Sequence, residues 1–281
     1  MIKAGILGTG NIGTDLLIKL QKSDFIEPVI FVGRRLDSKG IKIAKKLKIP
    51  TSIEGINFFK TNKNYCDVVY DCTNAYDAKL NSKVFKKMGL KVIDLTPAKV
   101  GQICVPIINS EIIKKLDNIN MITCGGQASI PIIDSISKNC NVEYIEVVSQ
   151  ISSDSAGMAT RINIDNYVET TENAIKSFCK CKSCKVILNL NPAIPQVDMQ
   201  TTIFIKAKEI NFSLINKSIY NTIKELQKFI PYYELVMPAV LNEDILVLSI
   251  RVRGSGDYLP EYAGNLDIIN CAAIEITKQL K

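Results

Sequence analysis

One cysteine stands in a setting that would make its thiol reactive. Residues 121–131 read MITCGGQASIP, so Cys124 follows an apolar strand pattern and precedes Gly125, Gly126 and a helix for which Ser129 is a candidate cap. A helix N-terminus favours the charged form of a nearby thiol, and we expect the pKa of Cys124 to be lowered. The N–H groups of the two glycines would lie beside the sulfur and stabilise an oxyanion. The segment predicts a nucleophilic cysteine.

The sequence contains no histidine, and this restricts the chemistry. Histidine is the usual general base near neutral pH, so serine triads, Cys–His pairs and zincin sites are excluded. Nine cysteines without a signal-peptide pattern indicate reduced thiols. Cys179, Cys181 and Cys184 form a C-x-C-x-x-C group with no further cysteine pair nearby, so we interpret it as a lysine-rich loop and predict no metal site. The other cysteines lie in apolar or helical runs: Cys66, Cys72, Cys104, Cys140 and Cys271.

A second constellation lies at the N-terminus. Gly8, Gly10 and Gly13 follow the apolar strand pattern of residues 2–7 and open a helical pattern at 15–20. In this fingerprint the first glycine permits the turn, the second admits a pyrophosphate and the third allows close helix packing. The helix N-terminus supplies N–H groups to the phosphates, so the segment predicts a dinucleotide site.

Two arginines bear on the choice of dinucleotide. An acidic residue normally follows the second strand and holds the ribose 2′-hydroxyl of NAD, but here residues 31–35 read FVGRR. Guanidinium groups suit a 2′-phosphate, so Arg34 and Arg35 favour NADP, alone or beside NAD. Two exposed arginines that follow a strand are the alternative interpretation.

The elements that would position these sites fall into two groups. Apolar strand patterns alternate with helical ones in the first part of the chain, which is typical of a parallel sheet covered by helices. From about residue 141 the strand-like runs are longer and crossover helices are few, which indicates a mixed or antiparallel sheet. The strand patterns lie at 2–7, 28–32, 67–71, 91–95, 118–123, 142–151, 185–190, 201–208 and 245–252.

We therefore predict an α/β protein with two domains. A Rossmann-type parallel-sheet domain would span residues 1–123 and be completed by a C-terminal helix at about 264–281. An α+β domain with a mixed or antiparallel sheet would span 124–263, carry catalysis and form a homodimer.

Charge and hydropathy predict a cytoplasmic protein that binds neither nucleic acid nor a membrane. The net charge of +7 comes from 35 basic and 28 acidic residues that are spread along the chain, which favours a solvated surface. No stretch approaches the roughly 18 to 20 apolar residues of a membrane span.

At this point the residues resemble a known family, the acylating acetaldehyde dehydrogenases, which oxidise a short aldehyde to acyl-coenzyme A. The similarity runs almost from end to end, and ordered segments are more specific than any single motif. These segments are GTGNIGTDL at 8–16, DLTPAKVG at 94–101, CGGQASIP at 124–131, SAGMATRINID at 155–165, ETT at 169–171, NPA at 191–193 and GDYLPEYAGNLDI at 256–268.

The resemblance implies roles for individual residues. It implies that the Cys124 thiolate attacks the aldehyde, that a hydride passes to nicotinamide, and that coenzyme A takes the acyl group from the thioester. It also implies a partner aldolase that supplies the aldehyde. The dinucleotide contacts that it implies are Thr9, Gly10, Asn11, Ile12, Ser153, Asp154, Ser155, Ala156, Gly157, Met158, Ala159, Thr160, Arg161 and Asn265.

The chain departs from the family pattern after residues 191–193. Where the family has an Arg-Asp pair, with the aspartate implicated in catalysis, this chain has Gln200 and Thr201, and Ile194 replaces a glutamate. Asp198 is a carboxylate nearby, but three residues along a strand it would face another direction. We interpret the chain as a subfamily with altered cofactor and substrate.

Two other functions stay open from the sequence. A semialdehyde or acyl-phosphate reductase would share the domain plan and the thiol, but it ordinarily needs a histidine. A non-catalytic dinucleotide-binding partner of an aldolase would explain the missing carboxylate. Acetylation of Cys124 by acetyl-coenzyme A distinguishes these from the acylating dehydrogenase.

Overall fold

The computed structural model describes residues 1–281, which form two compact units. Unit 1 comprises 1–121, 157–163 and 272–281, and unit 2 comprises 122–156 and 164–271. These boundaries differ from the expected 1–123 and 124–263, because a segment from the middle of the chain joins unit 1 and the C-terminal helix is divided between the units.

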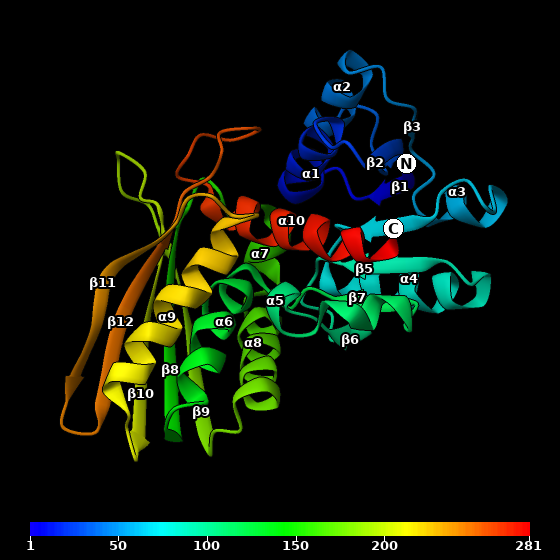
Figure 1. Cartoon of the computed structure of the whole chain (residues 1–281). Coiled ribbons are helices and arrows are strands. Elements are labelled where there is room, and N and C mark those ends of the chain that lie inside the picture. Colours follow the sequence, from blue (N-terminus) through cyan, green and yellow to red (C-terminus); the bar gives the residue numbers. More distant parts are fainter. The chain divides into compact units, whose positions relative to one another are not determined.

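Unit 1 is built on a parallel sheet of seven strands in the order β3-β2-β1-β4-β5-β7-β6 (Figure 1). Its strands are β1 Ile2–Leu7, β2 Ile26–Val32, β3 Thr51–Ser52, β4 Val68–Asp71, β5 Lys91–Asp94, β6 Gln102–Ile103 and β7 Asn118–Asn120. Its helices are α1 Asn11–Gln21, α2 Lys39–Lys46, α3 Ile56–Thr61, α4 Ala75–Met88, α5 Pro106–Asn109, η1 Ser110–Lys114, α7 Met158–Ile162 and η2 Lys278–Leu280.

Unit 2 contains a five-stranded mixed sheet in the order β11-β12-β10-β8-β9, in which only β8 and β9 are parallel. Helices α6, α8 and α9 lie along one face of this sheet (Figure 1). The elements are α6 Cys124–Ser137, β8 Asn141–Ser152, α8 Ile164–Cys179, β9 Ser183–Asn191, β10 Met199–Lys208, α9 Phe212–Gln227, β11 Tyr233–Asn242, β12 Ile245–Val252 and α10 Gly264–Thr277. The predicted fold class, a Rossmann-type parallel sheet plus a mixed sheet, is confirmed.

Alternation of side chains fixes which face of unit 2 is covered. In β10 every second residue from Met199 to Ala207 is buried, while the residues between them are partly or fully exposed. Because successive side chains of a strand point to opposite faces, the buried set faces the helices. Thr201 belongs to that buried set.

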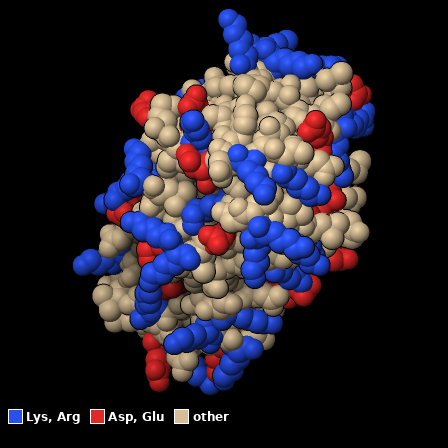
Figure 2. Space-filling view, turned by 90° about the vertical axis from the view of Figure 1, so that its right-hand side faces the viewer, with Lys and Arg blue, Asp and Glu red and all other residues tan.

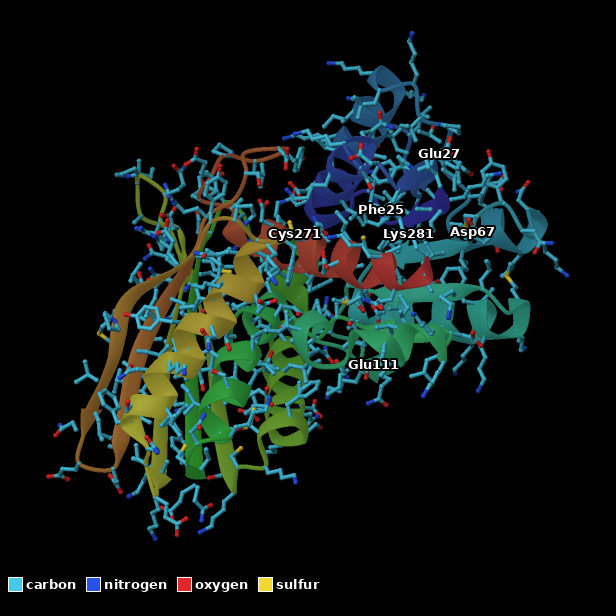
Figure 3. All side chains as sticks on the ribbon, viewed as in Figure 1. Phe25, Glu27, Asp67, Glu111, Cys271 and Lys281 are labelled. Carbon is cyan, nitrogen blue, oxygen red and sulfur yellow. The ribbon has the colours of Figure 1, made fainter.

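The C-terminus completes unit 1. The Thr277 hydroxyl, near the end of α10, lies 2.7 Å from Tyr70 Oη in the core of β4. Lys281 Nζ lies 4.6 Å from the centre of the Phe25 ring at the start of β2, and both residues are labelled in Figure 3. The last ten residues are therefore part of the parallel-sheet unit.

Two buried carboxyl groups face each other at the carboxyl end of this sheet. Asp71 and Asp94 are register partners on the parallel strands β4 and β5, and both are almost fully buried. Asp71 accepts hydrogen bonds from Thr73 and Asn81, whereas Asp94 accepts from Thr96 N and Asn120 Nδ2. Burial, together with the neighbouring charge of Asp71, raises the pKa of Asp94 to about 8. One proton therefore stays on the pair at neutral pH.

This pair predicts a pH dependence of stability. The unfolded carboxyl of Asp94 ionises near pH 4, at a pKa of about 3.9, whereas the folded one ionises near pH 8. Between these values the folded chain binds the extra proton, so the free energy of unfolding falls as the pH rises, by on the order of 1.4 kcal/mol per pH unit. We expect Asp94→Asn to flatten this slope in urea unfolding between pH 5 and 8. An unchanged slope would contradict the assignment.

Surface charge is mixed. On the face drawn in Figure 2, Lys and Arg side chains are spread over the surface with Asp and Glu between them. No helix of the structure is both long enough and apolar enough to cross a bilayer.

Candidate active site

Cys124 is the first residue of helix α6. Thr123 is the N-cap, and its Oγ1 accepts a hydrogen bond from Gly126 N at 2.9 Å. The helix thus begins several residues before Ser129, whose hydroxyl donates to Gly125 O within the helix, so the expected cap at Ser129 is wrong. The signal for the true cap, a threonine between a strand and two glycines, was present in the sequence.

The pKa of Cys124 differs from the expectation. Burial raises it to about 11, and hydrogen bonds from Tyr167 and from the N–H groups of Gly125 and Cys124 lower it by less. The helix start acts in the expected direction, but desolvation of the thiolate outweighs it. No charged side chain contributes to the shift.

A buried tyrosine touches the sulfur. The Cys124 thiol donates to Tyr167 Oη at 3.9 Å, and Tyr167 is only 5% exposed on helix α8. A Cβ atom on Gly125 would lie 2.0 Å from Tyr167 Oη and 3.0 Å from Ser149 Oγ. Only glycine leaves room for the phenol at the first turn of α6.

The two glycines have different tasks. Gly126 N–H donates to the capping Thr123 Oγ1, so it is not available to an oxyanion. Gly126 helps to position the helix start instead. Gly125 N–H acts on the Cys124 and Tyr167 side chains and lowers the pKa of both. The oxyanion role stays a prediction for Gly125, whose N–H is not used by the cap.

The hydroxyl of Thr201 replaces the carboxylate that the family pattern places at that position. Thr201 Oγ1 is buried and lies 3.0 Å from Ser149 Oγ on the neighbouring strand β8. Asp198 does not replace it, because its carboxylate lies 3.9 Å from Arg251 Nη1 and is partly exposed.

The glycine turn has the geometry that the fingerprint requires. Gly8 has φ +113°, and a Cβ there would lie 2.5 Å from Cys72 O. A Cβ on Gly13 would lie 2.0 Å from Gly8 O, so this glycine lets α1 pack against the turn. A Cβ on Gly10, the N-cap of α1, would meet no protein atom within 4 Å, which leaves open space at the helix start. A pyrophosphate fits there.

A cavity of about 430 Å³ opens beside this turn in unit 1. Of the predicted residues it is lined by Gly8, Gly10, Arg34, Met158 and Ala159. Lining residues that were not predicted from the sequence include Gly33, Gly55, Cys72, Thr73, Asn74, Asp77 and Asn81. Several of these follow strand β4, and the signal that would have found them is the rule that ligands bind beyond the carboxyl ends of parallel strands.

The two arginines have different surroundings. Arg34 lines the cavity and its Nη1 lies 3.1 Å from Asp77 Oδ2. Arg35 is not among the lining residues and donates two hydrogen bonds to Asp37, at 3.1 and 2.8 Å. Of the two arginines, only Arg34 therefore borders this cavity.

The remaining predicted contacts do not line the cavity: Thr9, Asn11, Ile12, Gly13, Ser153, Asp154, Ser155, Ala156, Gly157, Thr160, Arg161 and Asn265. Two places among these residues still suit contact with a ligand. A Cβ on Gly157 would lie 3.6 Å from Asn11 Nδ2. Residues 157–163 of unit 1 therefore begin beside the start of α1. Asn265 is 6% exposed in unit 2, and its Oδ1 has no hydrogen-bond partner in the protein. Such an orphaned acceptor fits a ligand that brings a donor.

The C-x-C-x-x-C group, predicted as a lysine-rich loop, runs from the end of α8 to the start of β9, and only residues 180–182 lie between these elements. Cys179 is buried at the end of α8, and Cys184 donates to Glu172 O at 3.5 Å. No group of three His, Cys, Asp or Glu residues in the structure is arranged to hold a metal ion.

Comparison with known proteins gives consistent matches. Residues 124–260 match a family described as prokaryotic acetaldehyde dehydrogenase, dimerisation, and residues 3–116 match one described as semialdehyde dehydrogenase, NAD binding domain. An acetaldehyde dehydrogenase of Pectobacterium atrosepticum is 47% identical over 99% of this chain and 95% of its own length. One from Spirochaeta aurantia is 45% identical over 99% of this chain and 94% of its own length.

A solved structure shares the fold. Aspartate semialdehyde dehydrogenase II from Vibrio cholerae, complexed with ASA, superposes with a TM-score of 0.67 over 100% of this chain and 98% of that chain. Its sequence is 14% identical, so the likeness concerns the fold alone.

Proposed function

Because this chain belongs to the acetaldehyde dehydrogenase family, we propose that it converts a short aldehyde and coenzyme A to acyl-coenzyme A through a thioester on Cys124. The observation that carries the proposal is the position of Cys124 as the first residue of α6, where Tyr167 Oη lies 3.9 Å from its Sγ. A nicotinamide dinucleotide, for which unit 1 has an NAD-binding domain, supplies the hydride acceptor when bound.

The chain's own residues account for the covalent steps. The Cys124 thiolate adds to the aldehyde carbon and gives a hemithioacetal, whose oxygen lies where Gly125 N–H stabilises negative charge. A thioester remains when the carbon gives its hydride to the dinucleotide that would be bound and the oxygen gives its proton to solvent water. The thiol of coenzyme A then attacks the carbonyl, its proton is released, and the Cys124 thiolate leaves.

Residues of unit 1 would hold the dinucleotide. The open start of α1 at Gly10 would receive the pyrophosphate, and Arg34 would meet a ribose 2′-phosphate in the same cavity. Asn265, in unit 2, stays a predicted dinucleotide contact, and its buried Oδ1 has no hydrogen-bond partner in the protein.

NADP use makes a specific prediction. We expect Arg34→Ala to lower kcat/KM with NADP about tenfold, the loss of one charge-assisted contact, and to change kcat/KM with NAD little. Arg35→Ala is the matched control, because Arg35 is tied to Asp37 and should change the ratio less. Steady-state kinetics with both nucleotides measure this. A strong NAD preference in the wild-type chain that survives both substitutions would overturn the assignment.

A homodimer is part of the proposal. The face of the unit 2 sheet opposite the helices carries partly exposed apolar residues on adjacent strands, namely Val148, Phe204, Val240 and Val247. Apolar residues on an uncovered sheet face favour association with a second copy. Sedimentation velocity of the full chain measures the mass. The cytoplasmic location and the aldolase partner stay predictions, and co-elution with an aldolase of short hydroxy-oxo acids tests the latter.

The experiment that tests the function is acyl transfer to the protein. Incubation with acetyl-coenzyme A should add one acetyl group to residues 116–138, a tryptic peptide in which Cys124 is the only cysteine. An unlabelled peptide, with no reduction of nicotinamide from aldehyde and coenzyme A, would overturn the proposal.

A further inference from the structure

The thiol site lacks the charged or basic partner that usually keeps a nucleophilic cysteine ionised. The chain has no histidine, no charged side chain acts on Cys124, and Thr201 stands where the family pattern has a carboxylate. Tyr167 is the one side chain that hydrogen-bonds to the sulfur. Whatever favours the thiolate must therefore act through hydroxyl groups and backbone dipoles.

Three hydroxyls lead away from the sulfur in a row. Tyr167 Oη lies 3.9 Å from Cys124 Sγ, and Ser149 Oγ lies 3.0 Å from Thr201 Oγ1. Tyr167 Oη and Ser149 Oγ border the same space beside Gly125, at 2.0 and 3.0 Å from the position of a Cβ there, and the interaction with Ser149 lowers the pKa of the phenol. All three side chains are at most 5% exposed. The row connects helix α8 with the central strands β8 and β10.

Thr201, the hydroxyl farthest from the sulfur, determines which hydroxyl of the row donates and which accepts. Thr201 Oγ1 is fully buried, and Ser149 Oγ is its one hydrogen-bond partner, so the Thr201 O–H is satisfied only when it donates to Ser149. A hydroxyl has a single proton to donate. Ser149 is then left with its own proton for Tyr167, so the phenol keeps its proton and can donate it to the sulfur once the thiol is ionised.

The frame around Tyr167 is rigid. The Thr171 hydroxyl donates to Tyr167 O and lies 2.7 Å from Thr123 Oγ1, the atom that caps α6. The phenol is also seated against Gly125, where no larger residue would fit. The oxygen is therefore held beside the sulfur by two helices.

We infer that Thr201, Ser149 and Tyr167 form a chain of hydroxyls that stabilises the Cys124 thiolate through a hydrogen bond from the phenol, and that this chain replaces the missing carboxylate. In the thiol form Cys124 donates to Tyr167, as the structure shows. On ionisation the thiol proton passes to solvent water and the phenol O–H turns to the sulfur. All three hydroxyls keep their protons, so the chain stays neutral. This role rests on the proposed function of Cys124, and Tyr167 would be a further catalytic residue.

The experiment measures ionisation of Cys124 without using the dehydrogenase reaction. Iodoacetamide reacts with the thiolate, and its rate of addition to peptide 116–138 is followed by mass spectrometry from pH 6 to 11. For Tyr167→Phe we expect the apparent pKa of Cys124 to rise and the rate at pH 8 to fall roughly tenfold, as for loss of a hydrogen bond to a charged group. Thr201→Val should lower the rate less, about two- to threefold.

The control is Tyr144→Phe, which removes a phenol oxygen of unit 2 that bonds Glu146 and not the thiol site. It should leave the pH profile of Cys124 unchanged. A wild-type profile in Tyr167→Phe would overturn the inference, because a merely structural tyrosine is replaced by phenylalanine without effect on ionisation. If Tyr167→Phe fails to fold, Ser149→Ala decides in its place, and an unchanged profile there would overturn the inference as well.

The two proposals fail in different ways. A wild-type chain that is not acetylated by acetyl-coenzyme A disproves the thioester function, whatever the alkylation profile. If the wild-type protein is acetylated normally but the pH profile of alkylation is unchanged in Tyr167→Phe and Ser149→Ala, the thioester function stands. The role of the three hydroxyls is then disproved.

Discussion

Cys124→Ala should reduce aldehyde oxidation by at least about 10,000-fold, since the nucleophile cannot be replaced by a neighbouring group. The side chain is at the start of α6, and no second thiol or histidine lies against Tyr167. The glycine turn lies in unit 1, so affinity for NADH should stay within about twofold of wild type, because no contact at that turn changes. Steady-state reduction of nicotinamide and NADH fluorescence titration measure the two effects.

Cys140→Ala is the matched control for this substitution. Cys140 is a half-buried thiol of the same unit, whose Sγ donates to Ile136 O at the end of α6. It should keep full acyl transfer. Residual activity of Cys124→Ala above a few per cent of wild type would mean that another group carries the acyl chain.

The second large effect is expected at Gly13. A Cβ there would lie 2.0 Å from Gly8 O. Gly8 O is a backbone atom, so it cannot move away without opening the turn. Gly13→Ala should therefore destabilise unit 1 by about 3 kcal/mol, as overpacking does, and lower dinucleotide affinity at least roughly tenfold by displacing the start of α1.

Gly10→Ala separates the two parts of that prediction. Its Cβ would meet no protein atom within 4 Å, and its φ of −79° is ordinary for alanine. The variant should unfold at the wild-type urea concentration yet bind NADH weakly, because the methyl group occupies the space of the pyrophosphate. Tight binding by Gly10→Ala would show that the phosphates lie elsewhere.

Local patterns were enough to predict most of the fold. Apolar strand runs and the glycine turn placed β1, β8, β10 and β12 to within a few residues, because these signals lie within a short stretch of chain. Strand β11 was missed. Its sequence is YELVMPAVLN, in which a proline interrupts the run, and the pairing with β12 shifts register near that point.

The nucleophile could be located from sequence, but its environment could not. Cys124 and Tyr167 are 43 residues apart, and Ser149 and Thr201 are 52 apart, so no spacing rule connects them. The pKa of Cys124 was predicted in the wrong direction for the same reason. A helix start is visible in the sequence, whereas the desolvation that outweighs it depends on how α8 and the sheet pack around the sulfur.

The division of α10 between the units has a consequence for biosynthesis. Domains of many proteins fold in turn as they leave the ribosome, the N-terminal one first. Here the parallel-sheet unit begins at Met1 but ends with residues 272–281, which supply the partner of Tyr70 and the cation over Phe25. Neither unit is encoded by one continuous stretch, and unit 1 cannot complete its core before residues 272–281 have been synthesised. The nascent chain must keep its first apolar strands from aggregating until that segment emerges.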